Sequence, residues 1–329
     1  MDLHLFDLNL LVALDALLRE CNVTQAGNRL NLSQPAMSGA LARLRSHFQD
    51  ELLVSVGRRM VRTPLGDELV EPVREILLQV RGTLEARSGF DPTTSTRHLT
   101  IAASDYVIAI LMADALRRVR CEAPHVTFDL RPLGPRAVEA LDNAELDFLI
   151  APASADFEAH GSEVLFEDSF TCVAWSGNRD VGATLSPEEY LNLGHVVVNV
   201  GQSPVGNDDE VYLRKTKRRR RVEISTPSFF LAPQLVVGTD RITTITTRLA
   251  LKYAEILPLK LVPLPIEIPP LVELLHWHRA HNQDPAHLWF RRILKTAVAA
   301  LPSADTKPAG GVPAHPRGWA RDEEVLEQS

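Results

Sequence analysis

Residues 23–45, VTQAGNRLNLSQPAMSGALARLR, constrain the fold of this chain more than any other stretch. They contain two short helical patterns joined by a tight turn. Thr24 is the predicted N-cap of the first pattern, and Ser33 is the predicted N-cap of the second. Pro35 lies in the first turn of the second helix, where its missing N–H costs nothing. Two short helices in this arrangement are typical of a helix-turn-helix.

The second helix begins with short polar side chains instead of bulky apolar ones. A helix that enters the DNA major groove must be slim at its leading end, so that polar side chains reach base edges. An ordinary capped helix in a small bundle is the alternative. The packing stripe is predicted as Ala36, Ala40, Leu41 and Leu44. The expected DNA-contacting residues in and around this helix are Thr24, Ser33, Gln34, Pro35, Met37, Ser38 and Arg43.

The flanking segments agree with a DNA-binding domain. Residues 7–20 show helical spacing of leucines behind Asp7, a predicted N-cap. After the second helix, residues 52–56 and 60–63 read as two short strands around a Gly-Arg-Arg turn. Such a wing places Arg58 and Arg59 at its tip, beside a neighbouring groove or phosphate backbone.

A long helix is predicted next, over residues 65–87. Leu69, Val73, Ile76 and Val80 step by four, three and four residues, as in a heptad seam that Leu84 continues one residue late. One interpretation is an amphipathic helix that lies on its own domain. The polar stretch SGFDPTTSTRH that follows favours a protruding helix that pairs with its copy.

Length, composition and charge limit the number of domains and the classes of partner that the chain can have. A chain of 329 residues with 45% hydrophobic residues is long enough for two domains with cores of their own. The net charge is −7, but the basic residues 43, 45, 58, 59 and 62 form a local positive surface opposed by only two acidic residues. No secretion leader and no apolar run of membrane-spanning length is found, so the cytoplasm is the expected compartment. The three cysteines lack metal-site or disulfide spacing, and we expect no metal and no cofactor.

Residues 98–301 alternate strand-like and helix-like segments, which predicts an α/β domain with mostly parallel sheets. Helical stretches are expected at 105–120, 228–238 and 284–301. In open α/β sheets ligands sit where strands end and helices begin. Ser104 occupies such a place, where its hydroxyl and nearby N–H groups form a site for an anion or a carbonyl; a purely structural cap is the alternative. The predicted strands are LTIAAS, VTFDLRP, LDFLIAP, FTCVAW, HVVVNV, RVEIST, ITTIT and KLVPLP.

The chain closely resembles the LysR-type transcriptional regulators. The resemblance rests on DLNLLVALDALL, VTQAGNRLNLSQPAMSGALARLR and DELLVSVGRRMVRTPLG, and it continues to about residue 301. The ending LLHWHRAHNQDPAHLWFRRIL is similar to the branch that contains regulators of nodulation genes and of aromatic-compound degradation. In the wing, many relatives read Leu-Phe-Val-Arg where this chain has Leu53, Val54 and Ser55. In those relatives this position often contacts the DNA backbone. In this chain, Arg58 or Arg59 would make that contact instead.

The resemblance implies an all-α winged helix-turn-helix, a long linker helix, and an α/β effector domain of two periplasmic-binding-protein-like subdomains. It implies homodimers and homotetramers that bind and bend promoter DNA, a small aromatic effector, RNA polymerase as partner, and probable activation of transcription. The expected divisions are residues 1–63 for DNA binding, 64–90 for the linker helix, 91–167 with 268–301 for subdomain 1, 168–267 for subdomain 2, and 302–329 for a disordered tail.

The resemblance also points to effector contacts. Arg248 follows ITTITT at a strand-to-helix junction, where a guanidinium binds a carboxylate; a surface arginine is the alternative. Asp168 matches a pocket-lining position of the branch, and it would repel a carboxylate. Either the ligand is neutral and phenolic, or Asp168 pairs with Arg248. Leu111 is a candidate pocket wall or a core leucine. Aromatic acids, chlorinated phenols and flavonoid-like compounds all remain candidates.

Other functions fit the sequence less well. A small-molecule binding protein without a DNA role is the second class considered. For an enzyme, we find no Gly-rich phosphate loop, nucleophile elbow or metal cluster. Trp277, His278 and Trp289 are interpreted as packing residues. The basic run at 214–221, RKTKRRRR, is interpreted as a solvated turn, with a nucleic-acid patch as the alternative.

Overall fold

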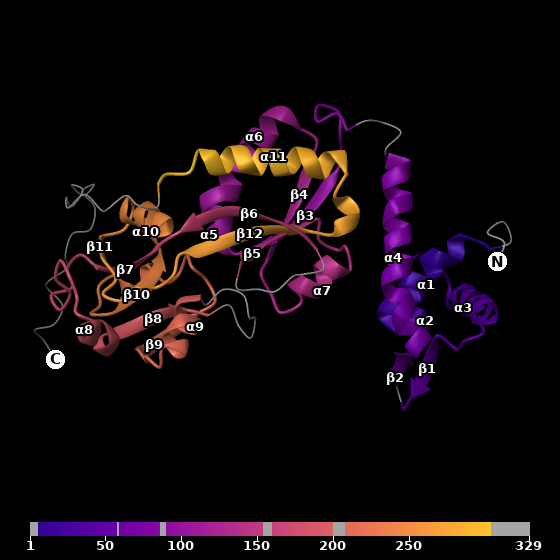
Figure 1. The fold of residues 1–329 in the computed structure, drawn as a ribbon, viewed down its shortest axis with the longest axis horizontal. Helices are drawn as coiled ribbons and strands as arrows, with labels where there is room; N and C mark the ends of the chain where they lie inside the picture. The colour runs from indigo at the N-terminus through magenta and orange to yellow at the C-terminus, as the bar shows by residue number, and fades with distance from the viewer. Residues whose placement is uncertain (1–5, 58, 86–89, 154–159, 200–207, 304–329) are drawn as a thin grey trace, which may run out of the picture. The chain divides into compact units, whose positions relative to one another are not determined.

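The computed structural model describes residues 6–57, 59–85, 90–153, 160–199 and 208–303 (Figure 1). The contacts divide the chain into two units, residues 1–92 with 279–288, and residues 93–278 with 289–329. The predicted wing-tip residue Arg58, and nearly all of the predicted tail, lie outside the described residues. Among those described, no helix has both the length and the apolar character needed to cross a membrane.

The first unit is a small helical domain with a two-stranded wing and a long final helix. Its core is built from leucines of the first and third helices, including Leu14, Leu17 and Leu44, none of which is exposed. The wing strands are antiparallel, with Leu53 opposite Arg62. The elements are α1 (Asn9–Glu20), α2 (Val23–Arg29), α3 (Gln34–Phe48), β1 (Leu53–Val56), β2 (Arg59–Arg62), α4 (Pro64–Glu85) and the short η4 (Arg279–His281).

Two of the predicted helix caps are wrong. Leu8 occupies the N-cap of α1 without a side-chain bond, while Asp7 accepts a hydrogen bond from the Asn9 amide. The cap of α2 is Asn22, whose side chain accepts from the Thr24 amide at 2.9 Å. Asn is as good a cap as Thr, and it stands where the extended backbone turns into the helix. The prediction for α3 is confirmed, because Ser33 accepts from the Ala36 amide at 3.4 Å.

Helix α4 combines the two interpretations of its apolar seam. Val73 is 3% exposed and packs into the core of the first unit, with Leu69 beside it. Further along the helix, Ile76 is 43% exposed and Val80 is 46% exposed. Pro72 lies inside the helix without ending it. The first half of the seam therefore packs on its own domain, and the second half presents apolar side chains outward.

The second unit contains two five-stranded mixed sheets, each flanked by helices. We call the sheet ordered β4-β3-β5-β12-β6 the first subdomain and the sheet ordered β11-β7-β10-β8-β9 the second. Ser169 separates β6 from β7 where the chain passes into the second subdomain, and residues 263–270 carry it back. The strands are β3 (His98–Ala103), β4 (Thr127–Pro132), β5 (Phe148–Pro152), β6 (Gly161–Asp168), β7 (Phe170–Trp175), β8 (Gly194–Val198), β9 (Arg221–Thr226), β10 (Ile242–Thr246), β11 (Leu259–Val262) and β12 (Leu271–Trp277).

The helices of the second unit follow strands, as the alternating pattern predicts. The region 105–122 is helical throughout, but its middle is a π-helix. The elements are α5 (Asp105–Val107), η2 (Ile108–Met112), α6 (Ala113–Glu122), α7 (Ala137–Asp142), α8 (Pro187–Asn192), α9 (Asp208–Lys215), η3 (Gln234–Val236), α10 (Thr247–Ala254) and α11 (Pro285–Ala299), whose first four residues belong to the first unit.

Three expectations for the second unit need correction. Each sheet has as many antiparallel pairs as parallel ones, because β12 and β7 bring the chain back against its earlier direction. The strands β6 and β12 are absent from the predicted set; β6 is an edge strand whose acidic residues at 163, 167 and 168 interrupt its apolar pattern. The predicted helix at 228–238 is only the short η3, because Pro233 and Gly238 interrupt a longer helix.

Candidate functional site

The leading end of α3 is an exposed polar surface. Ser33, Gln34, Pro35 and Ser38 are all exposed, as the helix-turn-helix interpretation expects. Met37 is not exposed, which corrects that part of the prediction. It is fully buried, because positions 37, 40, 41 and 44 form one helical face and the predicted member Ala36 lies off it. The bulky Met37 side chain therefore packs into the core of the domain, on the opposite side of α3 from the exposed polar side chains.

Two arginines of α3 have different environments. Arg43 is 62% exposed at its side chain and lies 3.3 Å from the Asp7 carboxylate. Arg45 donates from Nε to the Glu51 carbonyl at 2.8 Å and from Nη2 to the Leu53 carbonyl at 2.7 Å. Arg43 is therefore an exposed arginine paired with Asp7, whereas Arg45 ties the helix to the wing.

The wing presents a mixture of apolar and basic residues. Arg59 is exposed at the start of β2, and the tip residue Gly57 has φ +63°, a conformation that favours glycine. Val56, just before the tip, is 61% exposed. Thr24, in the first turn of α2, is also exposed. These side chains, with those at the leading end of α3, make up the candidate DNA-binding surface.

A pocket in the second unit lies between the two subdomains. Its cavity volume is about 20 Å³. Tyr106 and Glu273 line it from the first subdomain, and Phe229 and Thr244 line it from the second. Among the described residues, the lining is Ser104, Tyr106, Leu133, Pro152, Phe170, Val198, Asp209, Phe229, Thr244, Thr246, Leu271 and Glu273.

Ser104 caps α5, as its structural interpretation predicts, and it also lines this pocket. Its hydroxyl oxygen accepts from the Val107 amide at 3.2 Å. The Tyr106 amide is taken by the Asp105 carboxylate at 2.9 Å. Two of the N–H groups expected to meet an anion are thus already satisfied inside the protein, which disfavours an anion site here.

Asp168 and Arg248 do not serve as a free carboxylate receptor. Asp168 is 1% exposed and accepts a hydrogen bond from the Tyr106 hydroxyl at 2.5 Å, with Arg248 at 3.6 Å. The Arg248 guanidinium donates to the carbonyls of Glu167 and Pro302 and is not among the described residues that line the pocket. The predicted pairing of Asp168 with Arg248 is present, but Tyr106 is the closer partner.

Burial and charge shift the acidity of this buried pair. Burial, followed by the neighbouring Asp168 charge, holds the pKa of Tyr106 above its usual range. Burial also raises the pKa of Asp168, although the Tyr106 hydroxyl and the Arg248 charge oppose the shift. Tyr106 therefore stays protonated and donates, and its oxygen can still accept from a ligand.

The pocket lining is acidic and aromatic. Asp209 and Glu273 are carboxylates, and the described lining contains no lysine, arginine or histidine. Asp209 is paired with Arg220 at 2.8 Å, so its charge is balanced. Glu273 is 2% exposed. The predicted wall residue Leu111 is fully buried and is not among the lining residues, so it is a core leucine.

The sequence analysis missed Tyr106, Phe229 and Glu273 as pocket residues. Tyr106 had a usable signal, because it lies two residues beyond Ser104 at the strand-to-helix junction. Glu273 had a weaker one, a single acid within the apolar run LVELLHW. Phe229 had none, since its segment reads as part of a helix.

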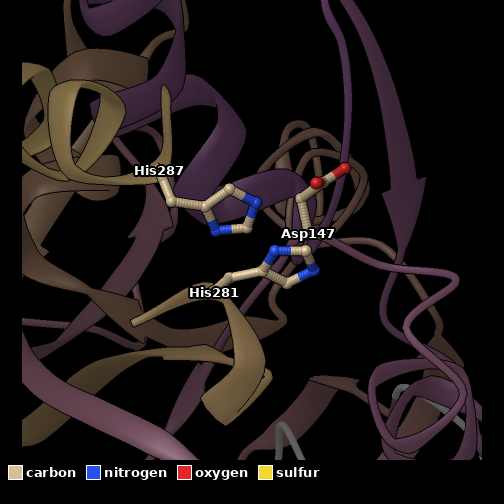
Figure 2. Close-up of side chains that lie close together, drawn as sticks. All are labelled: Asp147, His281 and His287. Carbon is tan, nitrogen blue, oxygen red and sulfur yellow. The ribbon is translucent and has the colours of Figure 1, made fainter. Parts of the chain in front are cut away.

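All three residues that are interpreted as packing residues are buried, namely Trp277, His278 and Trp289. Trp277 is 6% exposed, and the Arg291 guanidinium lies 4.1 Å from its ring centre. Figure 2 shows His281 and His287, whose ring centres lie 4.2 Å apart with their planes at 14°. The Asp284 carboxylate accepts from the His287 amide at 3.3 Å and so caps the start of α11.

The basic run is only partly solvated. Arg220 is buried against Asp209, and Arg221 pairs with Glu223 at 3.0 Å. Residues 215–219 are exposed. The turn interpretation therefore fits the middle of the run, while its end takes part in the packing of the second subdomain.

The chain matches two family models. Residues 8–67 match the bacterial regulatory helix-turn-helix protein of the lysR family, and residues 93–299 match the LysR substrate binding domain. Nodulation protein D 1 of Bradyrhizobium elkanii is 40% identical over 301 residues, which cover 92% of this chain and 96% of that protein. Nodulation protein D 2 of Rhizobium tropici is 41% identical over 297 residues, which cover 90% and 94%.

Solved structures agree with this assignment. A probable transcriptional regulator of Pseudomonas aeruginosa has 32% identity and a TM-score of 0.60, over 89% of this chain and 98% of that one. Full-length OxyR of the same organism, at 14% identity, shares the fold with a TM-score of 0.67 over 90% and 95%. The helix-turn-helix, the wing and the paired α/β subdomains are thus accounted for together: the chain belongs to the LysR family of DNA-binding transcriptional regulators with an effector-binding domain.

Proposed function

We propose that the chain recognises a promoter site by placing the leading end of α3 in the major groove. The observation that carries this proposal is the exposed polar row of Ser33, Gln34 and Ser38 over the buried Met37. Short polar side chains on a slim helix end can reach base edges. Thr24, Pro35, Arg43, Arg58 and Arg59 complete the proposed DNA-contacting set.

If two chains pair through α4, the second chain supplies a second α3 helix to contact the DNA bases. Support comes from Ile76 and Val80, which leave the second half of the seam exposed. A dimer of this kind reads half-sites about 34–36 Å apart, one helical turn of DNA. We further propose that dimers pair into tetramers, with the domain divisions expected from the sequence, and that the protein works in the cytoplasm, where bacterial promoters lie.

The proposed effector is a neutral aromatic molecule with phenolic hydroxyl groups. Support comes from the described lining, which has no basic side chain to bind a carboxylate ligand, and from Phe170 and Phe229, which offer ring contacts. The Tyr106 oxygen can accept a hydrogen bond from such a hydroxyl. Asp168 would act through Tyr106, and Ser104 would contact the ligand directly.

Thermal unfolding with added ligand tests the effector class. A ligand at one hundred times its Kd adds about 2.7 kcal/mol of stability. We expect a hydroxyacetophenone or a hydroxyflavone to raise the unfolding temperature and hydroxybenzoate to leave it unchanged. A shift with hydroxybenzoate alone would contradict the proposal.

An electrophoretic shift with the DNA upstream of the chain's own gene tests the regulator proposal. We expect binding at physiological salt that a hundredfold excess of unrelated DNA does not displace. Absence of a specific shift would favour a small-molecule binding protein without a DNA role. Transcription of the same fragment by purified RNA polymerase then tests activation, which we propose to proceed through contact with the polymerase.

A further inference from the structure

The effector pocket is closed in this structure. Its volume of about 20 Å³ holds about one water molecule, whereas pockets for small ligands measure about 300–1,000 Å³. Its walls come from both subdomains: Tyr106 and Glu273 on one side, and Phe229 and Thr244 on the other. An aromatic ligand therefore fits only after these walls move apart.

One carboxylate accepts three hydrogen bonds that join the two subdomains beside the pocket. Asp105, at the start of α5 in the first subdomain, accepts from the Ser228 hydroxyl at 2.6 Å. It also accepts from the amides of Phe229 at 3.3 Å and Phe230 at 3.2 Å. These three donors belong to one turn of the second subdomain, which follows β9.

The turn held by Asp105 carries a wall of the pocket. Phe229 lines the pocket, and its ring centre lies 6.0 Å from that of Tyr106, the residue next to Asp105. Lys252 adds a further contact, donating to the Ala109 carbonyl at 2.9 Å. That bond joins a charge to a neutral carbonyl at an exposed position, whereas the charged Asp105 is half-buried and receives three donors.

We propose that Asp105 is a positioning residue that acts as a latch on the effector pocket. It holds the 228–230 turn against α5. The ligand enters the pocket only in those molecules in which the hydrogen bonds of Asp105 are broken, which we call the open fraction. The apparent affinity for the ligand is then the intrinsic affinity multiplied by that open fraction. Asp105 sets the effector concentration to which the regulator responds. The proposal rests on the proposed function only in taking this pocket as the effector site.

Thiol reactivity in the full-length protein measures the open fraction directly. Val198 lines the pocket and is 7% exposed, so a Val198→Cys reporter reacts only when the pocket opens. The native Cys172 is fully buried in the core of the second subdomain and reports general loosening. Alkylation followed by peptide mass spectrometry reads the two positions separately in the same sample.

The test compares Asp105→Ala with Asp129→Ala in the Val198→Cys background. Asp129 is a matched control, because it lies in the same subdomain and its carboxylate pairs with Arg131 at 2.8 Å on the surface. Hydrogen bonds to a charged group are strong enough that their loss raises the open fraction about tenfold or more. We expect the reporter to react about tenfold faster in Asp105→Ala, with Asp129→Ala and Cys172 unchanged.

Several outcomes overturn the latch. They are an unchanged reporter rate in Asp105→Ala, an equal increase in Asp129→Ala, or a parallel increase at Cys172. If Asp105→Ala does not fold, Asp105→Asn keeps one acceptor and loses the charge. It should give a smaller increase at the reporter, and no increase there contradicts the proposal.

Titration with the hydroxyflavone separates this proposal from the proposed function. If the latch is correct and the pocket is the effector site, Asp105→Ala binds the hydroxyflavone about tenfold more tightly than the parent protein, in proportion to its larger open fraction. A faster reporter with no binding by either protein leaves the latch in place and contradicts the proposed effector site. If the parent binds the ligand but the reporter reacts no faster in Asp105→Ala, the latch is contradicted and the proposed effector site is not.

Discussion

The hydroxyl of Tyr106 donates to the carboxylate of Asp168 across 2.5 Å, and both side chains are almost completely buried. The two residues belong to α5 and to the end of β6, the strand from which the chain passes into the second subdomain. The bond therefore fixes a pocket residue to the crossover. Its loss should affect both the stability of the protein and the shape of the pocket.

Tyr106→Phe removes this donor and leaves a buried carboxylate with fewer partners. We expect a loss of about 1–3 kcal/mol in the free energy of unfolding at pH 7. Burial already raises the folded-state pKa of Asp168, and removal of the Tyr106 hydroxyl, which opposes the shift, raises it further. The folded variant then binds a proton more readily than the unfolded chain, so the loss shrinks as pH falls below that raised pKa. Urea unfolding at a series of pH values from about 7 down to about 4 checks this, and a loss that stays constant across the series would contradict it.

Met37→Ala tests the buried position beneath the reading end of α3. Truncation of a fully buried methionine costs about 2–5 kcal/mol, because it leaves a cavity in the core. Urea unfolding measures the cost, and the relative affinities of the folded variant for different operator sequences should equal those of the parent. A changed base preference with little loss of stability would place Met37 at the DNA instead.

Arg45→Ala and Arg43→Ala form a matched pair on one helix. Arg45 donates to the Leu53 carbonyl of the wing and to the Glu51 carbonyl just before it, so its removal should cost about 1–2 kcal/mol in unfolding free energy and weaken DNA binding by loosening the wing. The exposed ion pair of Arg43 with Asp7 contributes little to stability, so Arg43→Ala should cost about 0.5 kcal/mol or less. Equal costs for the two variants would be inconsistent with these roles.

Two buried histidines predict a loss of stability in mild acid. Burial lowers the folded-state pKa of His195 and of His276 to about 4, while the unfolded-state value is 6.5. Between pH 6.5 and 4 the unfolded chain binds more protons, so stability falls with falling pH, by about 3 kcal/mol per histidine at pH 4. His195→Gln keeps a donor for the Tyr190 carbonyl, which His195 Nε2 contacts at 2.6 Å. In urea unfolding of this variant, the free energy of unfolding should depend less steeply on pH, by the equivalent of one proton. An unchanged slope would show that His195 is not the titrating group.

The sequence predicts the DNA-binding unit well because its signals are local. The Ser33 cap, Pro35 in the first turn and the Gly57 turn of the wing each act within a few residues, and all are present in the structure. Met37 was misplaced because Ala36 and Met37 both lie at helical spacing from Ala40 and Leu44. Only the direction of the neighbouring helices decides between them.

The pocket could not be predicted to the same depth. Tyr106 and Asp168 are 62 positions apart, and Asp105 and Phe229 are 124 positions apart. The first contact depends on the position of β6, a strand that the sequence patterns did not reveal, and the second depends on how the turn after β9 meets α5. The bonds of Arg248 to the carbonyls of Glu167 and Pro302 could not be predicted either, because these groups become its neighbours only after folding.

The central claim is that the leading end of α3 reads bases while the wing holds the backbone. Selection from a randomised promoter fragment, with the parent, Gln34→Ala and Arg59→Ala, tests it most directly. We expect Gln34→Ala to relax preference at one or two base positions by about 1–3 kcal/mol, and Arg59→Ala to weaken binding to every sequence and lower the salt dependence by about one phosphate contact. Unchanged base preference in Gln34→Ala, or the same loss of preference in both variants, would contradict the account.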